Sequence, residues 1–351
     1  MANTSSPQHR DSHRSLTRRS FGVLALGSFS ALALAACGSS NSSDSNASAS
    51  SASTSAKPAP SALPSGMGST AGDGEFPRTV KHFRGETKIE SAPKSVVILS
   101  TGQLDDVLAL GLVPIGAATA NDADLVPEYL KTKFSDKSAE LDKIAKVGKR
   151  TEPDLGAIAN LHPDLILINN TNKKEEVYES LSKIAPTVVT EGTGHNWKQD
   201  FLMIASALGA TSKAEEMLKD YEDKAKKLGE KAGKEKTFSF LYAAGDRTRV
   251  YAKSSFVGSI CEDASLARPA VQQEGKTSID LSSENLDQAD GDYLFYGVQG
   301  GDESKLTSET LWESLKAVKE KHAHKVDSDM FYLNAGITAA LGVIEEIDKN
   351  I

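Results

Sequence analysis

The sequence predicts an α/β protein of two lobes with mainly parallel sheets, joined by a single long helix. Short β-branched runs alternate with helical patterns in residues 75–195 and again in residues 233–351. Between these two parts, residues 196–232 change to a pattern of long helices. Residues 1–74 have a different composition and are expected to lie outside the folded body.

Residues 1–36 have the parts of an export signal in the right order. Four arginines precede an apolar run at residues 21–36, and Leu34-Ala35-Ala36 leads to Cys37. The run of 16 residues is short for roughly 30 Å of hydrocarbon, which disfavours the alternative of a transmembrane anchor. The end of the run resembles the lipobox of bacterial lipoproteins, and Arg18-Arg19 resembles a twin-arginine signal. We therefore expect cleavage before Cys37 and acylation of its thiol.

Residues 37–74 are predicted to be a disordered tether. Beyond Cys37 the segment consists mostly of Ser, Ala, Gly, Asn and Pro, with Asp44, Lys57 and Asp73 as its only charged residues. Such a composition buries too little apolar surface to offset the entropy of ordering.

The composition of the remaining chain excludes some classes of function. Removal of residues 1–36 changes the formal net charge from −8 to −11, which argues against nucleic acid as a partner. Cys261 is the one cysteine besides Cys37, so no disulfide within the lipidated chain is expected. Cys261 is predicted to be a small buried apolar residue.

The first lobe is predicted at residues 75–195. Its strands are expected at residues 95–99, 113–117, 165–168 and 187–190, and its helices at residues 104–110, 155–160 and 178–184.

The connecting helix is predicted within residues 196–232. Its apolar residues recur every three or four positions: Ala214, Leu218, Tyr221, Ala225 and Leu228. Ser212 with Glu215 matches a capping box at its start.

The second lobe is predicted at residues 233–351. Its strands are expected at residues 237–242, 249–252, 293–296 and 325–326, and its helices at residues 255–262, 284–289, 311–318 and 338–348. Two such lobes favour a ligand cleft at the carboxyl ends of the strands.

Several short motifs occur in an order that is typical of one family. They lie at residues 92–97 (APKSVV), 108–116 (LALGLVPIG), 147–155 (VGKRTEPDL), 161–166 (LHPDLI), 184–187 (IAPT), 282–286 (SSENL) and 331–334 (FYLN). From about Pro77 onward, the chain resembles the iron–siderophore binding proteins of bacterial uptake transporters.

The resemblance implies two Rossmann-like lobes, joined by one long helix that permits little hinge motion. It also implies a monomeric receptor without cofactor or enzymatic activity. Such a receptor delivers a ferric siderophore to an ABC permease driven by a cytoplasmic ATPase.

The resemblance further implies a set of ligand-binding residues in both lobes. They are Gly102, Gln103, Arg150, Asn170 and Thr171 in the first lobe, and Arg247, Arg249, Tyr251, Phe256, Gln299, Phe331 and Tyr332 in the second. In some relatives the tyrosine matching Tyr332 reaches the iron; packing in the core is the alternative role.

Departures from the family pattern bear on the ligand. Catecholate-type relatives tend to have arginines at the positions of Thr171, Phe256 and Gln299, and citrate-type relatives tend to have an arginine-rich segment at 333–335. A cleft with few cations favours a less anionic ferric complex, of hydroxamate or mixed type.

Glu284 matches a glutamate with which relatives dock on permease arginines. The equivalent position of the first lobe is Gly156, so Glu152 is the candidate substitute.

Other functions on the same scaffold stay open as alternatives. Heme or vitamin B12 could replace the siderophore. A zinc or manganese receptor would need about three histidines with a carboxylate, and His322-Ala323-His324 offers only part of such a set. An enzyme is disfavoured, because the chain has no Gly-x-Ser-x-Gly motif and its Glu274-Gly275-Lys276-Thr277 lacks the first glycine of a phosphate loop.

Overall fold

The computed structural model describes residues 57–120 and 124–351. The predicted export signal, Cys37 and the first part of the predicted tether lie outside the described residues. Within the described ranges, no helix has the length and apolar character needed to span a bilayer.

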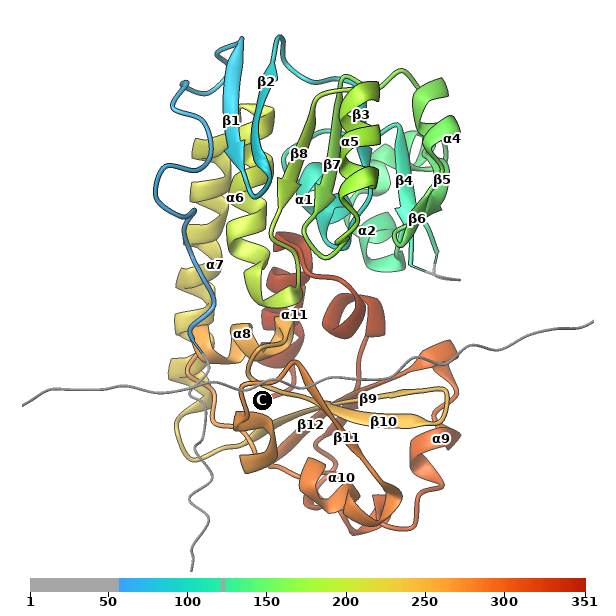
Figure 1. Ribbon diagram of the computed structural model, residues 1–351. Helices are drawn as coiled ribbons and strands as arrows, with labels where there is room; N and C mark the ends of the chain where they lie inside the picture. The colour runs from blue at the N-terminus through green and yellow to red at the C-terminus, as the bar shows by residue number, and fades with distance from the viewer. Residues whose placement is uncertain (1–56, 121–123) are drawn as a thin grey trace, which may run out of the picture. The chain divides into compact units, whose positions relative to one another are not determined.

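The first lobe is built on a six-stranded sheet in the order β6-β5-β4-β3-β7-β8 (Figure 1). Its neighbouring strands are parallel except for β5 and β6, which form an antiparallel pair. The strands are β3 (Val96–Ile98), β4 (Gly116–Thr119), β5 (Ala145–Lys149), β6 (Glu152–Pro153), β7 (Leu165–Asn169) and β8 (Thr187–Thr190). Every residue of β3, β4, β7 and β8 is buried, which explains why these strands appear in the sequence as unbroken runs rather than alternating patterns.

Five α-helices accompany this sheet. They are α1 (Gln103–Ala109), α2 (Glu128–Lys133), α3 (Ser138–Leu141), α4 (Leu155–Asn160) and α5 (Glu175–Ile184). The predicted helices at 155–160 and 178–184 are confirmed, and β4 lies a few residues beyond its predicted position.

An antiparallel hairpin that the sequence did not predict precedes the sheet. It consists of β1 (Arg78–His82) and β2 (Gly85–Ile89). The amide of Phe83, in its turn, donates to the carbonyl of Val189 at 3.2 Å and so ties the hairpin to β8. Arg78 is buried and donates to the carbonyl of Ser206 at 2.7 Å.

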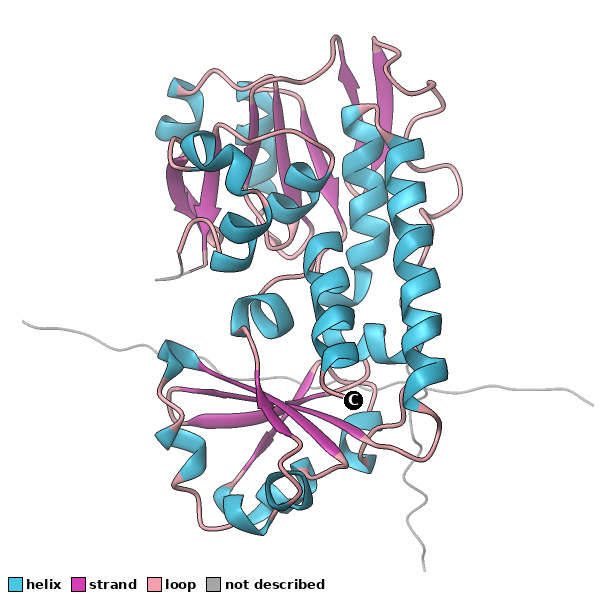
Figure 2. Cartoon of the chain, turned by 180° about the vertical axis from the view of Figure 1, so that it is seen from behind, coloured by secondary structure: helices cyan, strands magenta, loops and turns pink. Residues whose placement is uncertain are grey.

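Helices α6 (Trp197–Leu208) and α7 (Thr211–Ala232) follow the first lobe, and α7, with 22 residues, is the long helix that leads into the second lobe (Figures 1 and 2). The predicted apolar stripe of α7 is confirmed, since its buried residues are those five: Ala214, Leu218, Tyr221, Ala225 and Leu228. The stripe packs into a core that also includes residues of α6 and of the second lobe.

The predicted capping box at the start of α7 is wrong. No side chain of the helix caps its first turn. The carboxylate of Asp73 accepts the amides of Thr211 and Ser212 instead, each at 2.8 Å. The carboxylate of Asp73, from outside the helix, thus caps the start of α7 in place of Ser212.

The predicted tether is also corrected, because its residues 57–74 lie against the folded body. Gly68 pairs with Lys81 of β1, and the amide of Ser69 donates to the hydroxyl of Ser206 at 2.7 Å. Leu63 packs against two hydrophobic clusters. Composition alone missed this, since most of these bonds use backbone groups that every residue has.

The second lobe has a five-stranded sheet in the order β11-β10-β9-β12-β13. The strands are β9 (Phe238–Ala244), β10 (Arg247–Tyr251), β11 (Ser278–Leu281), β12 (Tyr293–Val298) and β13 (Ala323–Lys325). β9, β12 and β13 are parallel, while β9, β10 and β11 form an antiparallel meander. The two sheets together remain rich in parallel pairs, as predicted.

The helices of the second lobe are mostly short. The α-helices are α8 (Phe256–Asp263), α9 (Ser304–Thr307), α10 (Lys316–Lys319) and α11 (Ile337–Lys349). The predicted helix 311–318 is interrupted at Leu315, whose backbone is extended, so a 3₁₀ turn (Trp312–Ser314) precedes α10. The predicted helix 284–289 is a 3₁₀ segment (Ser283–Ala289). Other tight turns are Ser135–Lys137, Gly194–Asn196, Ala270–Gln273 and Gln299–Gly301, with a π turn at Asp329–Leu333.

Helix α11 is a main contact of the second lobe with the first. It packs against α1, α6 and α7. Cys261, in α8, is fully buried, and burial raises the pKa of its thiol to about 11, which agrees with the predicted apolar role.

Candidate functional site

Three adjoining hollows form a cleft at the carboxyl ends of β3, β4 and β7. The first-lobe pocket has a volume of about 530 Å³ and is lined by residues of the first lobe alone. The interlobe pocket, of about 680 Å³, is lined by residues of both lobes. The floor pocket, of about 180 Å³, is also lined by residues of both lobes, including Phe256 of α8. All three share Thr101. The two larger volumes lie in the range of small-molecule sites.

The loop after β3 reaches the cleft as predicted. Gly102 has a φ of +83°, and a β-carbon there would lie 2.4 Å from the carbonyl oxygen of Ala335. Only glycine therefore allows α1 to begin this close to the second lobe. The amide oxygen of Gln103 accepts the backbone amides of Leu99 and Ser100 at 3.1 and 2.9 Å, so Gln103 shapes the loop and also lines the floor pocket.

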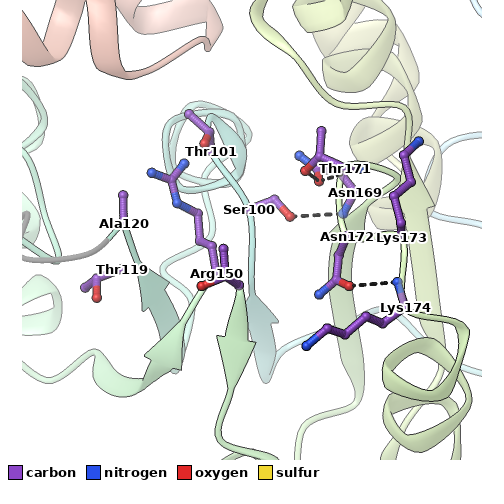
Figure 3. A pocket seen from close by; sticks show the side chains of 11 residues that line it. Ser100, Thr101, Thr119, Ala120, Arg150, Asn169, Thr171, Asn172, Lys173 and Lys174 are labelled. Atoms are coloured by element: carbon purple, nitrogen blue, oxygen red, sulfur yellow. Dashed lines mark hydrogen bonds between the residues drawn. The ribbon is translucent and has the colours of Figure 1, made fainter. Parts of the chain in front are cut away.

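Arg150 lies where the predicted site needs a cation. It follows β5, in which Gly148 has a φ of +90°, and it lines both the first-lobe and the interlobe pockets. Figure 3 shows its guanidinium reaching into the first-lobe pocket. Arg150 forms no ion pair with any described residue, and burial lowers the pKa of its guanidinium without neutralising it.

The loop after β7 contributes more of the pocket than was predicted. Thr171 lines the first-lobe pocket together with Asn169 and Asn172, which belong to the polar run after the predicted strand 165–168, and with Lys173 and Lys174, which the sequence did not suggest. The motif comparison found the loop, but it could not say which of its side chains face the cleft.

Asn170, which was predicted to bind ligand, lines none of the three pockets. Its side chain accepts from the guanidinium of Arg84 at 3.1 Å and donates to Glu191 at 3.2 Å. Successive side chains at a strand end point to opposite faces, so Asn169 and Thr171 face the cleft and Asn170 does not.

The second lobe contributes five of its seven predicted residues. Arg249 and Gln299 line the interlobe pocket, and Tyr251, Phe256 and Tyr332 line the floor pocket. Arg247 does not, because it forms an exposed ion pair with Asp280 at 2.7 Å.

Phe331 and Tyr332 are corrected in different ways. Phe331 is fully buried between Phe240 and Phe295 and belongs to the core. Tyr332 presents its ring to the floor pocket, but its hydroxyl donates to the carbonyl of Phe295 at 2.7 Å. Burial raises the pKa of Tyr332 well above its ordinary value, which opposes the phenolate that an iron ligand would need.

The expectation of a cleft with few cations is also wrong. Arg150, Lys173 and Lys174 line the first-lobe pocket without any acidic side chain, and Arg249 lines the interlobe pocket. The interlobe pocket also contains Asp124 and Asp329. Burial and the charges of Asp327 and Asp124 raise the pKa of Asp329.

Two carboxyl groups lie at the floor of the cleft. Asp106 and Asp200 both line the floor pocket. Burial raises the pKa of Asp200 to about 7, although the amides of Gly192 and Glu191 donate to its carboxylate at 2.8 and 2.9 Å. Burial and the charge of Asp105 raise the pKa of Asp106 well above its ordinary value.

The histidines of the described chain do not form a metal centre. His322 stacks on Tyr293, with ring centroids 4.7 Å apart, and His324 lies against Phe295. Among residues 57–120 and 124–351, no group of three His, Cys, Asp or Glu side chains is placed to hold an ion.

The two glutamates predicted to dock on the permease are exposed. Glu284 lies in the first turn of the 3₁₀ segment Ser283–Ala289, and Glu152 lies in β6. Neither forms an ion pair with a described residue.

Residues 96–330, which include most of both lobes, match the profile of the family described as periplasmic binding protein. The chain belongs to this family. The periplasmic binding protein fold accounts for the two lobes and the cleft between them, and it assigns the chain to non-enzymatic receptors.

The names of three similar proteins state what each of them binds. The chain is 34% identical over 289 residues to the probable siderophore-binding lipoprotein YfiY of Bacillus subtilis, covering 77% of this chain and 86% of that protein. It is 28% identical to the Fe(3+)-citrate-binding protein YfmC of Bacillus subtilis, covering 83% of this chain and 91% of YfmC. The crystal structure of Staphylococcus aureus SirA complexed with staphyloferrin B superposes with a TM-score of 0.66 and 28% identity, covering 78% of this chain and 97% of SirA.

Proposed function

We propose that this periplasmic binding protein is an extracytoplasmic receptor that binds a ferric siderophore in its interlobe cleft. It delivers the complex to an ABC permease driven by a cytoplasmic ATPase. The observation that carries the proposal is a cleft of several hundred Å³ with unpaired cationic side chains. Such a cleft suits iron that arrives already wrapped in oxygen donors.

The cleft chemistry separates this function from the alternatives. A receptor for bare zinc or manganese needs protein ligands that converge on one point. The described residues supply no such group, whereas they supply Arg150, Arg249, Lys173 and Lys174 to the pockets. The names of YfiY and YfmC support iron over heme or vitamin B12.

The charge of the cleft bears on the ligand class. Guanidinium and ammonium groups without acidic partners attract anionic oxygen. The first-lobe pocket therefore favours a ferric complex with at least one anionic arm, which a mixed-type siderophore has and a neutral hydroxamate complex lacks.

Membrane attachment through Cys37 is part of the same proposal. The relative YfiY is named a lipoprotein, and the sequence has a lipobox-like segment before Cys37. An acylated Cys37 would hold the receptor at the cell membrane, because each buried methylene contributes about 0.8 kcal/mol. Mass spectrometry of the membrane fraction, with Cys37→Ala as the control, tests for the acyl chains.

Docking on the permease is proposed to use Glu284 and Glu152. Both are exposed and free of ion pairs with described residues, so they are available to cations of a partner. The variant Glu284→Arg is expected to impair uptake of radioactive iron in cells while leaving ligand affinity unchanged. Normal uptake by this variant would argue against the docking role.

Fluorescence titration against a panel of ferric complexes tests the ligand. Trp197 packs edge to face on Phe256, which lines the floor pocket, with ring centroids 5.7 Å apart. Trp312 packs on Tyr296 instead, so the variant Trp312→Phe leaves Trp197 as the sole reporter. At least one ferric siderophore is expected to quench Trp197, and Arg150→Ala is expected to weaken that binding about tenfold. Arg247→Ala is the matched control. Quenching by a bare divalent ion, with none by any ferric complex, would overturn the proposal.

A further inference from the structure

The loop that follows β7 lacks an apolar anchor of its own. Thr171, Lys173 and Lys174 are exposed, and Asn172 is half-buried, yet all four line the first-lobe pocket. Within the loop, two backbone amides donate hydrogen bonds to asparagine side chains that precede them by two residues. The amide of Thr171 donates to Asn169, and the amide of Lys174 donates to Asn172, each at 3.2 Å.

A single arginine from the β1–β2 hairpin contacts this loop along its whole length. The Nε of Arg84 donates to the side-chain oxygen of Asn170 at 3.1 Å. One Nη donates to the backbone carbonyl of Asn172, and the other donates to the carboxylate of Glu175 at 3.3 Å. The guanidinium carbon lies 5.6 Å from the centroid of the Tyr178 ring, in α5.

The geometry of these contacts requires a guanidinium. Its donors form a rigid planar fork that reaches three acceptors at once, whereas a lysine ammonium is a point charge on a flexible stem. The side chain of Arg84 is only 13% exposed, which strengthens each hydrogen bond. The hairpin is itself fixed to β8 through Phe83, so Arg84 connects the loop to the sheet.

We propose that Arg84 is a positioning residue that holds the loop 170–174 in its cleft-lining conformation and thereby sets the affinity for ligand. Arg84 lines none of the three pockets, so its side chain is not expected to contact a ligand bound there. Arg84 acts on ligand affinity through Asn172 and Lys174, which line the first-lobe pocket. Figure 3 shows their side chains on the side of the pocket opposite Arg150. The affinity part of this inference rests on the proposed function.

Amide hydrogen exchange of the ligand-free protein is the first test. The variant Arg84→Lys keeps the charge and removes the fork. Exchange of the amides of Thr171 and Lys174 is expected to accelerate about tenfold, since both bonds exist only in the observed loop conformation. The matched control is Arg247→Lys, which removes a guanidinium fork from an exposed arginine–carboxylate pair that lines none of the three pockets. Unchanged exchange in Arg84→Lys would overturn the proposal.

Ligand affinity is the second test. Arg84→Lys is expected to weaken binding of a ferric siderophore about tenfold with an unchanged melting temperature, while Arg247→Lys binds as the parent does. Equal affinity, despite accelerated exchange, would refute the link to ligand. If the parent protein bound no ferric complex, the proposed function would fail, and the exchange experiment would still decide whether Arg84 orders the loop.

Discussion

The carboxylate of Asp105, in the first lobe, accepts the backbone amide of Thr338, in the last helix of the second lobe, at 2.8 Å. Its other oxygen accepts the amide of Ala339 at 2.9 Å and the hydroxyl of Tyr129 at 3.0 Å. Asp105 is thus the cap of α11, supplied across the contact between the lobes. This link joins α1 of the first lobe to α11 of the second.

Replacement of Asp105 by alanine is predicted to destabilise the whole protein. The variant leaves the amides of Thr338 and Ala339 and the hydroxyl of Tyr129 without their acceptor in a buried place. The loss of the cap and the unpaired donors together are expected to lower the free energy of unfolding by about 3 kcal/mol. Denaturation by urea measures it, with the exposed Asp280→Ala as control. An effect no larger than that of the control would contradict the capping role.

The second prediction is that Asp73, and not Ser212, caps α7, so that only Asp73→Ala lowers stability. Asp73→Ala removes the acceptor of the amides of Thr211 and Ser212, and is expected to cost about 1 kcal/mol. Ser212→Ala is expected to change stability little, since the hydroxyl of Ser212 does not cap the helix. Thermal unfolding of both variants decides whether Asp73 or Ser212 caps the start of α7. A larger effect of Ser212→Ala would restore the capping box.

Tyr332 provides a test of direct iron ligation. Its hydroxyl is engaged with the carbonyl of Phe295, so Tyr332→Phe should cost about 1 kcal/mol of stability through the lost hydrogen bond. The visible absorption of a bound ferric complex should be the same in both proteins, because no phenolate contributes to the iron. Loss of a phenolate-to-iron band in the variant would show that Tyr332 moves to the metal on binding.

Asp200 predicts a dependence of stability on pH. Its pKa is raised from 3.8 to about 7, so the folded protein keeps a proton that the unfolded chain releases between these values. The contribution of this group to the free energy of unfolding therefore falls as the pH rises from about 4 to about 7. Glu191 raises this pKa, and Asp106 lies in the same pocket.

The variant Asp200→Asn removes this titration. Its free energy of unfolding, measured with urea at several pH values, is expected to fall less steeply between pH 4 and pH 7 than that of the parent. A constant offset from the lost carboxylate is expected as well, so the slope is the decisive quantity. Parallel curves would mean that Asp200 does not hold the proton.

The sequence predicted the elements whose pattern is set by burial. The strands β3, β4, β7 and β8 are buried along their length, and α7 buries one stripe, so periodicity located them, while the partly exposed β5 and β6 were missed. The hairpin β1–β2 was missed because β1 buries Arg78 and His82 beside Val80, so its inward positions show no run of alternating apolar residues. The break at Leu315 was missed because an apolar helical pattern continues through it.

The sequence predicted the loops of the site better than the side chains within them. Arg150 and Thr171 face the cleft, but Asn170 and Arg247 face away, since a shift of one residue at a strand end reverses direction. Arg84 gave no signal, because the residues to which its guanidinium donates lie 86 to 91 positions later in the chain. Contacts over such distances are decided by the fold.

The junction of the lobes and the ligand-facing loop are built from separate residues. Gly102 and Asp105 meet the backbone of α11 and its preceding turn, while the loop 170–174 is fixed by Arg84. Ligand preference can therefore drift during evolution without disturbing the frame that a transporter recognises. For the design of biosensors, the loop is the segment to diversify, and the junction is the one to leave intact.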